Sequence, residues 1–435
     1  MGRWLLLTSA VLFVLGYAIS RDIRFEKAYA GDLRNRVTGS RIVKDGGSPY
    51  FYKWSAADGL RYYDPQNFDD WRPSHMTSTP VMYRLLSPLV EMPQATISRC
   101  WLVLEYLMFA GIALWAFLRA VTPLQRQAVL LVFGLVLLTN GWKQHVANGQ
   151  TYLCIPLFAM LFFAFWEKNG HPARDLAAGV AAACLVGIRP NTALFFVGFL
   201  FLIPFYPRRR LLWFCLPAVL LAGWTLFSSH ERGLWQDYFH NVAEATKINQ
   251  KLHPDIVHNV ADPHYRKWEG IDTVETTRYM DHPPAPIYSE NGNFFVLFNG
   301  IFHTVLSVTA MGVLALGAIG IVVLLFFLRL RGQPSDKPDL AGAALLGVCL
   351  FMIADLASPI YRHQYYTVQW IFPLLLAATE FTPGRKWIYV LLLVGLLLNC
   401  IHLPFVKMGQ TIGEYGLLLG FLGMALTPRG FRDLG

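Results

Sequence analysis

Apolar runs recur from one end of the chain to the other, and they constrain its fold more than any other feature. A run of roughly 20 apolar residues can cross a bilayer as a helix. Twelve runs of about that length or shorter predict an all-α polytopic membrane protein, with residues 1–435 forming a single integral membrane domain. The predicted spans are residues 4–20, 101–118, 127–138, 152–166, 176–188, 192–206, 211–227, 301–328, 341–357, 368–378, 387–402 and 415–426.

Composition agrees with a membrane protein. Of 435 residues, 54% are hydrophobic and 15% are charged, which is too little polar surface to cover a soluble globule of this size. The formal net charge of +9 does not indicate nucleic-acid binding, because the longest basic block is the three residues 208–210. The six cysteines lie in or beside apolar runs without paired spacing, so they are expected to be small buried side chains rather than disulfides or zinc ligands.

The short connectors predict the orientation of the chain. Cytoplasmic loops carry an excess of Lys and Arg, and placing Arg3 inside puts every basic connector on the same side, with both termini cytoplasmic. The first run is interpreted as a signal anchor; a cleaved signal peptide would leave eleven spans in the same orientation. The basic connectors contain Arg119, Arg126, Lys168, Arg174, Arg208, Arg209, Arg210, Arg329, Arg331, Lys337, Arg385, Lys386, Arg429 and Arg432.

Two long loops are then external: residues 21–99, which contain the candidate catalytic Asp, and residues 228–299. Both are polar, rich in proline and aromatic, and too low in net charge for disordered linkers, so they are expected to fold against the membrane surface. Residues 80–90 suit an interfacial helix.

The stretch AYAGDLRNRVTG, residues 28–39, places Asp32 and Arg36 four residues apart just after the first predicted span. On a helix these side chains share a face and are able to pair. One interpretation is an exposed ion pair that contributes little to stability. The other is a general base at the outer membrane surface, with the guanidinium orienting it or binding phosphate.

A second polar cluster, NGWKQHVANGQ at residues 140–150, lies between two short predicted spans on the external side. Gly149 lets the backbone turn or approach a ligand, whereas an interfacial loop anchored by Trp142 is the alternative. The candidate binding residues here are Lys143, His145, Asn148 and Gln150.

Two further charged residues lie at or near the outer ends of predicted spans. Arg189 stands beside the helix-breaking Pro190, and Asp355 lies inside an apolar run. Ionisable residues in such positions are functional candidates, with snorkelling to lipid headgroups as the alternative for the arginine. The residues that follow Asp355 suit either a site for a lipid phosphate leaving group or an aromatic belt; they are Arg362, His363, Tyr365 and Tyr366.

Motifs of several enzyme classes are missing from the sequence. It contains no Walker A loop, no H-E-x-x-H, no G-x-S-x-G and no Asp-x-Asp of the kind that holds a metal on a nucleotide diphosphate. Asp69 and Asp70 are adjacent and would project in different directions, which makes a weak metal site. We therefore expect chemistry without a metal, a cofactor or a bound nucleotide.

In their order along the chain, five motifs resemble those of glycosyltransferase family 87, a group of bacterial membrane enzymes of the C-type glycosyltransferase superfamily. The resemblance runs from about Asp32 to Tyr366 and so covers most of the chain. The motifs are GDLRNRVTGSRIVKDGGSPYFYKW, STPVMYRLLSPL, NGQTYL, IRPNTALFF and SPIYRHQYY.

This resemblance implies the C-type glycosyltransferase fold and sugar transfer on the external, periplasmic face of a bacterial inner membrane. The donor would be a polyprenyl-monophosphate sugar, carrying mannose, arabinose or another sugar, and the acceptor a lipid or glycan. Asp32 matches the family's catalytic Asp, with Asp22 as the competitor nearer the span. Gln150 matches the family's Gly-Gln, and His363 matches a late His beside aromatic residues.

Other positions transfer from the family by place in the motif. Arg189 stands where a basic residue followed by Pro is usual, and Arg362 and Tyr366 flank the late His. A monophosphate leaving group carries less charge than a nucleotide diphosphate, so a few cationic donors stabilise it without a divalent ion. Attack opposite the phosphate predicts inversion, with Asp32 as base. Aromatic faces suited to a sugar or to interfacial anchoring are Tyr50, Tyr52, Trp54 and Trp71.

Two other functional classes fit the sequence. A transporter or a flippase for envelope glycolipids agrees with twelve spans and an intramembrane Asp355, and it should hold its charges near the bilayer midplane. An envelope scaffold would scatter the candidate residues over its surface. An enzyme should instead gather Asp32, Arg189 and His363 around one external cavity open sideways to lipid.

Overall fold

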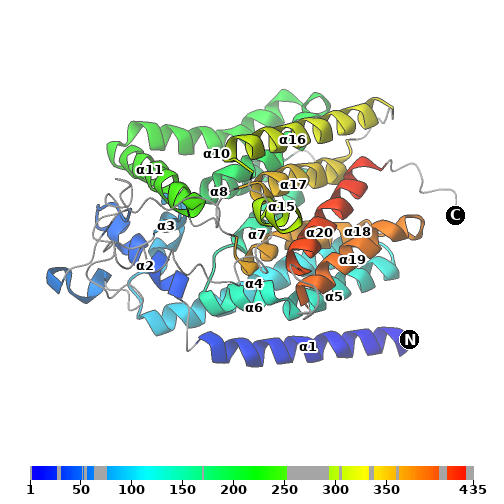
Figure 1. The fold of residues 1–435 in the computed structure, drawn as a ribbon, viewed down its shortest axis with the longest axis horizontal. Coiled ribbons are helices and arrows are strands. Elements are labelled where there is room, and N and C mark those ends of the chain that lie inside the picture. The colour runs from blue at the N-terminus through cyan, green and yellow to red at the C-terminus, as the bar shows by residue number, and fades with distance from the viewer. Residues whose placement is uncertain are drawn as a thin grey trace.

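In the computed structural model, every regular element of the described chain is a helix (Figure 1). The structure describes residues 2–26, 31–50, 52, 56–62, 76–168, 171–251, 293–302, 306–332, 338–358, 362–400 and 409–427. Labels with α are α-helices, and labels with η are 3₁₀ helices. The elements are α1 (Gly2–Glu26), α2 (Gly31–Lys44), η1 (Ala56–Tyr62), α3 (Pro80–Leu86), η2 (Ser87–Leu89), α4 (Gln94–Arg119), α5 (Pro123–Leu138), α6 (Asn140–Asn148), α7 (Cys154–Glu167), α8 (Pro172–Ile188), η3 (Pro190–Phe196), α9 (Val197–Leu200), η4 (Ile203–Phe205), α10 (Arg208–Phe227), α11 (Ser229–Lys251), α15 (Phe294–Phe302), α16 (Val308–Arg331), α17 (Leu340–Leu356), η5 (Gln364–Trp370), α18 (Ile371–Thr379), η6 (Pro383–Arg385), α19 (Lys386–Cys400) and α20 (Gly409–Leu426).

Five segments of the described chain are long and apolar enough to cross a membrane. They lie in α1, α4, α10, α16 and the η6–α19 segment, and α5 with α6 makes a sixth if this pair, bent by 58°, is one span. The chain is therefore an all-α membrane protein. Each of the twelve predicted runs overlaps a helical element, but several of these elements are short, and the run at 192–206 is divided among η3, α9 and η4. The count of twelve spans stays a prediction.

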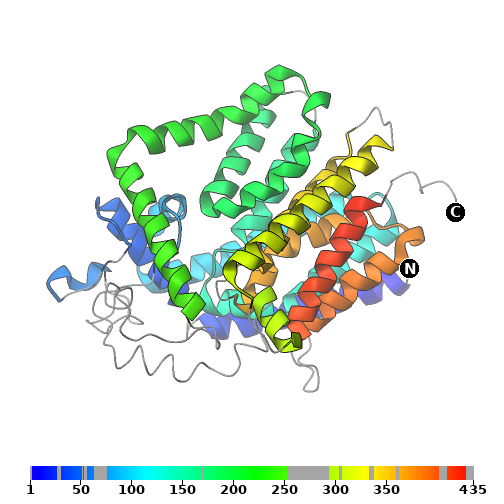
Figure 2. The ribbon, with the colours of Figure 1, turned by 45° about the horizontal axis from the view of Figure 1, so that its top comes forward.

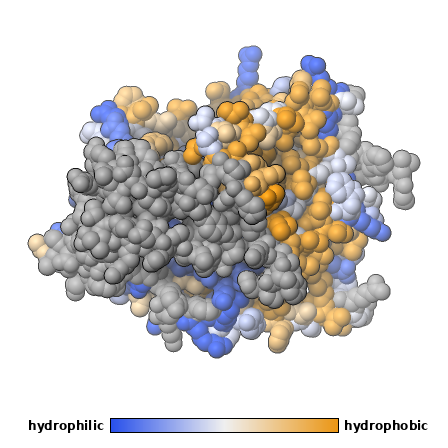
Figure 3. Space-filling model, viewed as in Figure 1, coloured by the Kyte–Doolittle hydropathy of each residue, from blue (hydrophilic) through white to orange (hydrophobic). Residues whose placement is uncertain are grey.

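The outer helices expose apolar side chains. In α16 only Met311, Val322 and Phe326 are buried, whereas Leu316 is 70% exposed. Figure 3 shows hydrophobic residues gathered over this part of the bundle. A continuous apolar surface of this kind is unfavourable in water, so these faces suit contact with lipid.

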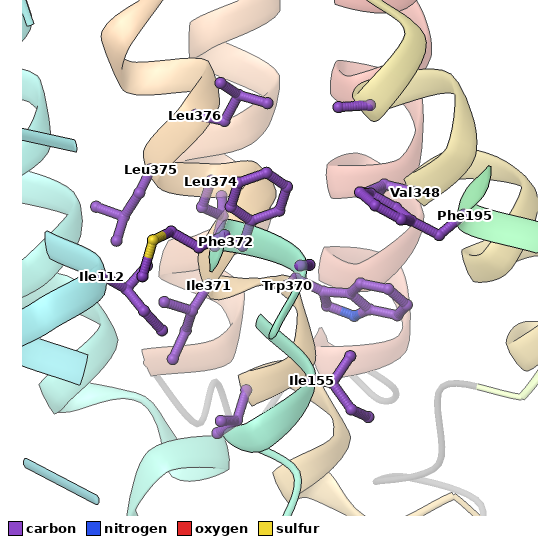
Figure 4. Close-up of a cluster of buried hydrophobic side chains, with 14 of the residues drawn as sticks. Ile112, Ile155, Phe195, Val348, Trp370, Ile371, Phe372, Leu374, Leu375 and Leu376 are labelled. Atoms are coloured by element: carbon purple, nitrogen blue, oxygen red, sulfur yellow. The ribbon is translucent and has the colours of Figure 1, made fainter. Parts of the chain in front are cut away.

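The helix α17 lies at the centre and is buried along nearly its whole length. It packs against α20, η3, α9 and α16. Gly347 faces the backbone carbonyl of Phe195, and Gly198 faces that of Ala343, so a methyl group on either glycine would overlap the facing carbonyl. Small residues let membrane helices approach this closely. Figure 4 shows Phe195, Val348 and Trp370 on one side of the resulting core, with Leu374, Leu375 and Leu376 of α18 across from them.

Basic residues of the predicted cytoplasmic connectors pair with acids at the ends of neighbouring helices. Arg210 donates through Nε to Oδ1 of Asp175 at 2.7 Å, which joins α10 to α8. Arg119 contacts Glu167 and Glu380 at 2.9 Å each, which joins α4 to the ends of α7 and α18. These pairs connect helix ends at one side of the bundle; the membrane orientation itself stays a prediction.

The described parts of the two predicted external loops fold together. In Figures 1 and 2, α2, α3 and α11 lie at the end of the bundle opposite the first residues of α1. Arg84 of α3 pairs with Glu231 of α11, and Ser48 donates to Asp237 of α11 at 2.6 Å. The helix predicted at 80–90 is present as α3 and η2. Positions 54, 69, 70 and 71, which include two candidate aromatic platforms and the weak metal site, lie outside the described residues.

Candidate functional site

Asp32 and Arg36 lie one turn apart on α2, and both contact Gln150. The Nε2 atom of Gln150 donates to Oδ2 of Asp32, and Oε1 of Gln150 accepts a 2.7 Å hydrogen bond from Nη2 of Arg36. Only this orientation of the amide satisfies both neighbours, because a carboxylate only accepts and a guanidinium only donates. The two charged groups therefore meet through an amide, and in the described part of the chain they form no direct ion pair.

The end of α6 fixes the position of Gln150. Gly149 adopts φ 61° and ψ 50°, the left-handed conformation. Its N–H donates to the carbonyl of Val146 at 3.0 Å, and the N–H of Gln150 donates to the carbonyl of His145 at 2.9 Å. These two bonds form a Schellman motif, which glycine accommodates without steric cost. Gln150 is fully buried, and its carbonyl accepts from Nε1 of Trp101 at 3.2 Å.

Ser78 supports Arg36 from the other side. Nε of Arg36 donates to Oγ of Ser78 at 3.2 Å, and the hydroxyl of Tyr50 donates to the carbonyl of Ser78 at 2.7 Å. Tyr50 is buried, with its ring centroid 6.0 Å from that of Tyr83 and 5.8 Å from that of Tyr238. Burial raises the pKa of Tyr50 far above its usual value, so the phenol stays neutral. Tyr50 therefore binds Ser78, the residue that holds Arg36, and its buried ring is not exposed as an aromatic face for a sugar.

One N–H group of the Arg36 guanidinium makes no hydrogen bond to the described residues. Its Nη1 atom is buried and has no hydrogen-bond partner among the described residues, a costly arrangement unless another group completes it. His363 lies near enough to Asp32 and Arg36 for both charges to act on its pKa. Burial lowers the pKa of His363 to about 4, while Asp32 raises and Arg36 lowers that pKa. His363 is therefore neutral at pH 7.

Aromatic rings connect His363 to Arg189. The His363 ring stacks on Tyr365 at 4.8 Å and 13°. Tyr152 follows Gln150 by two residues. Its ring centroid lies 5.4 Å from that of Tyr365 and 4.6 Å from that of Tyr366. The guanidinium of Arg189 lies 5.1 Å from the centroids of both Tyr152 and Tyr366. The aromatic cluster Tyr152, Tyr365 and Tyr366 thus lies between the residues of α2 and Arg189.

Arg189 uses its donors on neighbouring side chains. Nη2 donates to Oδ1 of Asp355, Nη1 donates to Oε1 of Gln369 at 3.2 Å, and Nε donates to Oδ1 of Asn191 at 3.2 Å. The motif IRPN explains this placement, because α8 ends at Ile188 and Pro190 begins η3. The bend brings Arg189 to the C-terminal end of α17, where Asp355 lies.

Arg362 is the second arginine of this buried group. It contacts Oδ2 of Asp355 at 2.9 Å and Oε2 of Glu414 at 3.5 Å, and all three side chains are 2% exposed. Glu414 also accepts from Thr367 and from Nε1 of Trp370 at 2.6 Å each. Two arginines and two carboxylates therefore compensate each other. The group of partly buried Arg189 with buried Asp355 and Arg362 resembles a structural ion network more than an open phosphate site.

Other candidates from residues 140–150 make their side-chain contacts elsewhere. His145 is fully buried, with Nε2 3.2 Å from Oε1 of Glu105. Asn148 donates to the carbonyl of Gln144 at 2.9 Å, one turn earlier on α6. Lys143 is half-buried on the same helix. Their roles in substrate binding stay predictions.

Asp22, the competing candidate for the base, is fully buried. Oδ1 accepts from Nε of Arg21 at 2.7 Å, and Oδ2 accepts from the hydroxyl of Tyr106 at 2.7 Å and from Nε1 of Trp142 at 2.9 Å. A carboxylate with three donors and no exposed surface joins α1 to α4 and α6. This position favours Asp32 as the candidate base.

Several residues that complete the site were not singled out from the sequence. Tyr152 and Ser78 lie inside motifs that carry the family resemblance, and Glu414 is a charged residue at the edge of an apolar run, so both signals were available. Tyr238 and Gln369 carry no such signal, because only the fold brings them to the cluster. The missed residues are Ser78, Glu105, Tyr152, Tyr238, Gln369 and Glu414.

Comparisons with known proteins add no family assignment: no family model, no curated protein and no solved structure matches the chain. Among the described residues, no group of three or more His, Cys, Asp and Glu side chains is arranged to hold a metal ion. The function therefore has to be argued from the geometry of the site.

Proposed function

We propose that the chain is a membrane glycosyltransferase with a C-type fold and twelve spans. It transfers a sugar from a polyprenyl-monophosphate donor to a lipid or glycan acceptor on the outer face of a bacterial inner membrane. One observation carries the proposal: Asp32 and Arg36 are held by Gln150, with an unpartnered arginine donor beside a neutral histidine. A base next to an anion-binding group is what inverting transfer from a phosphate requires.

Asp32 acts as the general base. Its Oδ2 accepts from Gln150, and its Oδ1 accepts no hydrogen bond from the described residues. The acceptor hydroxyl loses its proton to Asp32 as its oxygen attacks the anomeric carbon. The bond between that carbon and the phosphate oxygen breaks, and the electron pair leaves with polyprenyl phosphate. Attack from the opposite face inverts the anomeric configuration.

Arg36 and His363 receive the departing phosphate. Nη1 of Arg36 has no partner among the described residues, and a neutral imidazole such as that of His363 carries one N–H donor. Negative charge grows on the phosphate oxygens in the transition state, so donors fixed in advance stabilise it there more than in the ground state. This assignment moves the anion-binding role from Arg189, whose donors are in use, to Arg36.

The aromatic cluster Tyr152, Tyr365 and Tyr366 suits the sugar. Tyrosine rings offer an apolar face to the C–H side of a pyranose or furanose, together with hydroxyls for its polar edge. The cluster lies between His363 and Arg189. A sugar stacked there would present its anomeric carbon near α2.

The distribution of charge favours an enzyme over a transporter. Asp355 lies one residue before the end of α17, Arg189 follows the end of α8, and Glu414 is in the second turn of α20. These positions are at helix ends, whereas a transporter of this size is expected to hold its charges near the middle of its spans.

The test is transfer by the purified protein in lipid nanodiscs from a panel of polyprenyl-monophosphate sugars. Release or transfer of radiolabelled sugar, dependent on Asp32, is expected for at least one donor, and the product should have inverted configuration by NMR. A protein that is folded but inactive with every donor, or that moves the intact lipid between leaflets of a vesicle, would overturn the proposal.

A further inference from the structure

The amide of Gln150 is inserted between a carboxylate and a guanidinium that would otherwise meet. Asp32 and Arg36 stand four residues apart on α2, a spacing at which opposite charges pair directly. In the structure each binds a different end of the same amide instead. The backbone of Gln150 is fixed independently by the Schellman motif of α6 and by Trp101. The amide is thus carried by a rigid element that belongs to neither charged residue.

We propose that Gln150 is a positioning residue that keeps Asp32 and Arg36 apart and orients both. Separation leaves Oδ1 of Asp32 available to accept a proton, and it leaves Nη1 of Arg36 available to an anion. A direct ion pair would use the same atoms on each other and weaken the carboxylate as a base. This role rests on the proposed glycosyl transfer for its catalytic meaning, whereas the coupling of the three side chains can be measured without it.

Two substitutions of Gln150 should displace the pH–rate profile in opposite directions. Gln150→Met keeps the volume and removes both hydrogen bonds, so Asp32 and Arg36 collapse into a direct pair. The guanidinium then favours the charged carboxylate, and the acidic limb of kcat moves to lower pH while kcat at its plateau falls about 10- to 100-fold. Gln150→Glu still accepts from Arg36 but places a second carboxylate beside Asp32, and the acidic limb moves to higher pH.

The controls separate positioning from loss of structure. Gln144→Met makes the same replacement at an exposed site on α6 and should leave the profile unchanged. A role confined to packing would lower kcat in both Gln150 variants without moving the limb. Two variants that lose activity with unshifted limbs would overturn the proposal.

A measurement without turnover decides the coupling itself. Melting temperatures are recorded in detergent for Gln150→Met, Asp32→Asn and the double variant, and for the matching cycle with Arg36→Met. Residues in one hydrogen-bonded network give non-additive changes, whereas independent ones add. Additive shifts in both cycles would overturn the inference. If the wild type transfers no sugar while the cycles are non-additive, the proposed function fails and the positioning geometry stands.

Discussion

Two groups of the same residue types lie at one end of the bundle, and they differ in what is left open. In each, a glutamine amide bridges an aspartate and an arginine: Gln150 between Asp32 and Arg36, and Gln369, which donates to Asp355 at 2.9 Å and accepts from Arg189. Asp355 also pairs directly with two arginines and is buried, whereas Asp32 is half-buried and pairs directly with no arginine of the described segments.

We expect this difference to separate a structural group, around Asp355, from the candidate active site, around Asp32. When an aspartate is paired on both oxygens inside the protein, as Asp355 is by Arg189, Arg362 and Gln369, it serves to hold elements together. When one oxygen and one N–H remain open, the same chemistry is available to a ligand. The Asp355 group holds η5 against α17 and so positions the tyrosines of η5. We expect substitutions in the two groups to affect different measurements.

The largest expected effect is on catalysis. Asp32→Asn removes the base while keeping its shape, and transfer should fall about 10³-fold or more, within the range for general base catalysis. The melting temperature should change little. Asp58→Asn, the same change on an exposed residue of η1, is the control and should retain transfer. Wild-type rates in Asp32→Asn would remove the distinction between the two groups.

Loss of the Asp355 carboxylate should lower the stability of the fold. Asp355→Asn removes the buried carboxylate that Arg189 and Arg362 share and leaves Arg362 buried without it. Breaking such a network costs about 3–5 kcal/mol. Thermal unfolding in detergent, followed by size-exclusion fluorescence, measures the change. A variant that melts like the wild type but no longer binds donor would make the Asp355 group part of the binding site.

The arginines offer a finer comparison. Arg36→Lys keeps the charge but loses the fork that reaches Ser78, Gln150 and a ligand together, so the KM for donor should rise about 10- to 100-fold, equivalent to about 1.5–3 kcal/mol for a hydrogen bond to a charged group. Arg189→Lys should lower the melting temperature and leave KM within about threefold. The reverse pattern would return phosphate binding to Arg189.

The smallest effect concerns the outer surface, away from both groups. Arg61 and Lys44 lower the pKa of the exposed Glu91 carboxyl from 4.5 to about 2. Since this pKa is lower in the folded chain, its stabilising contribution is complete above pH 4.5 and is lost as the pH falls toward 2. Arg61→Met should therefore flatten the slope of melting temperature against pH between 5 and 3. An unchanged slope would contradict a stabilising interaction between Arg61 and Glu91.

Local sequence patterns predicted the elements better than their contacts. Apolar runs predicted the helices, Pro190 predicted the break after α8, and Gly149 predicted the turn, because these depend on nearby residues alone. The bridge from Gln150 to Asp32 spans 118 positions, and no local pattern contains it. Asp22 competes with Asp32 for the role of base in the sequence, and only the fold, which surrounds Asp22 with three donors, separates the two. Tyr238 could not be predicted either, because only the fold brings it beside Tyr50.

A helix without a lipid-facing side has consequences for how the protein is made. The inner helix α17 touches η3 and α9, which are synthesised long before it, and α20, which is synthesised last. Its sequence is apolar enough for lipid to surround it during insertion, yet in the folded chain nearly all of it is buried against other helices. Folding therefore cannot be completed one helix at a time. Until α20 is made, one side of α17 has no partner, and a nascent chain stopped before α20 would hold its candidate site residues on an incomplete helix bundle.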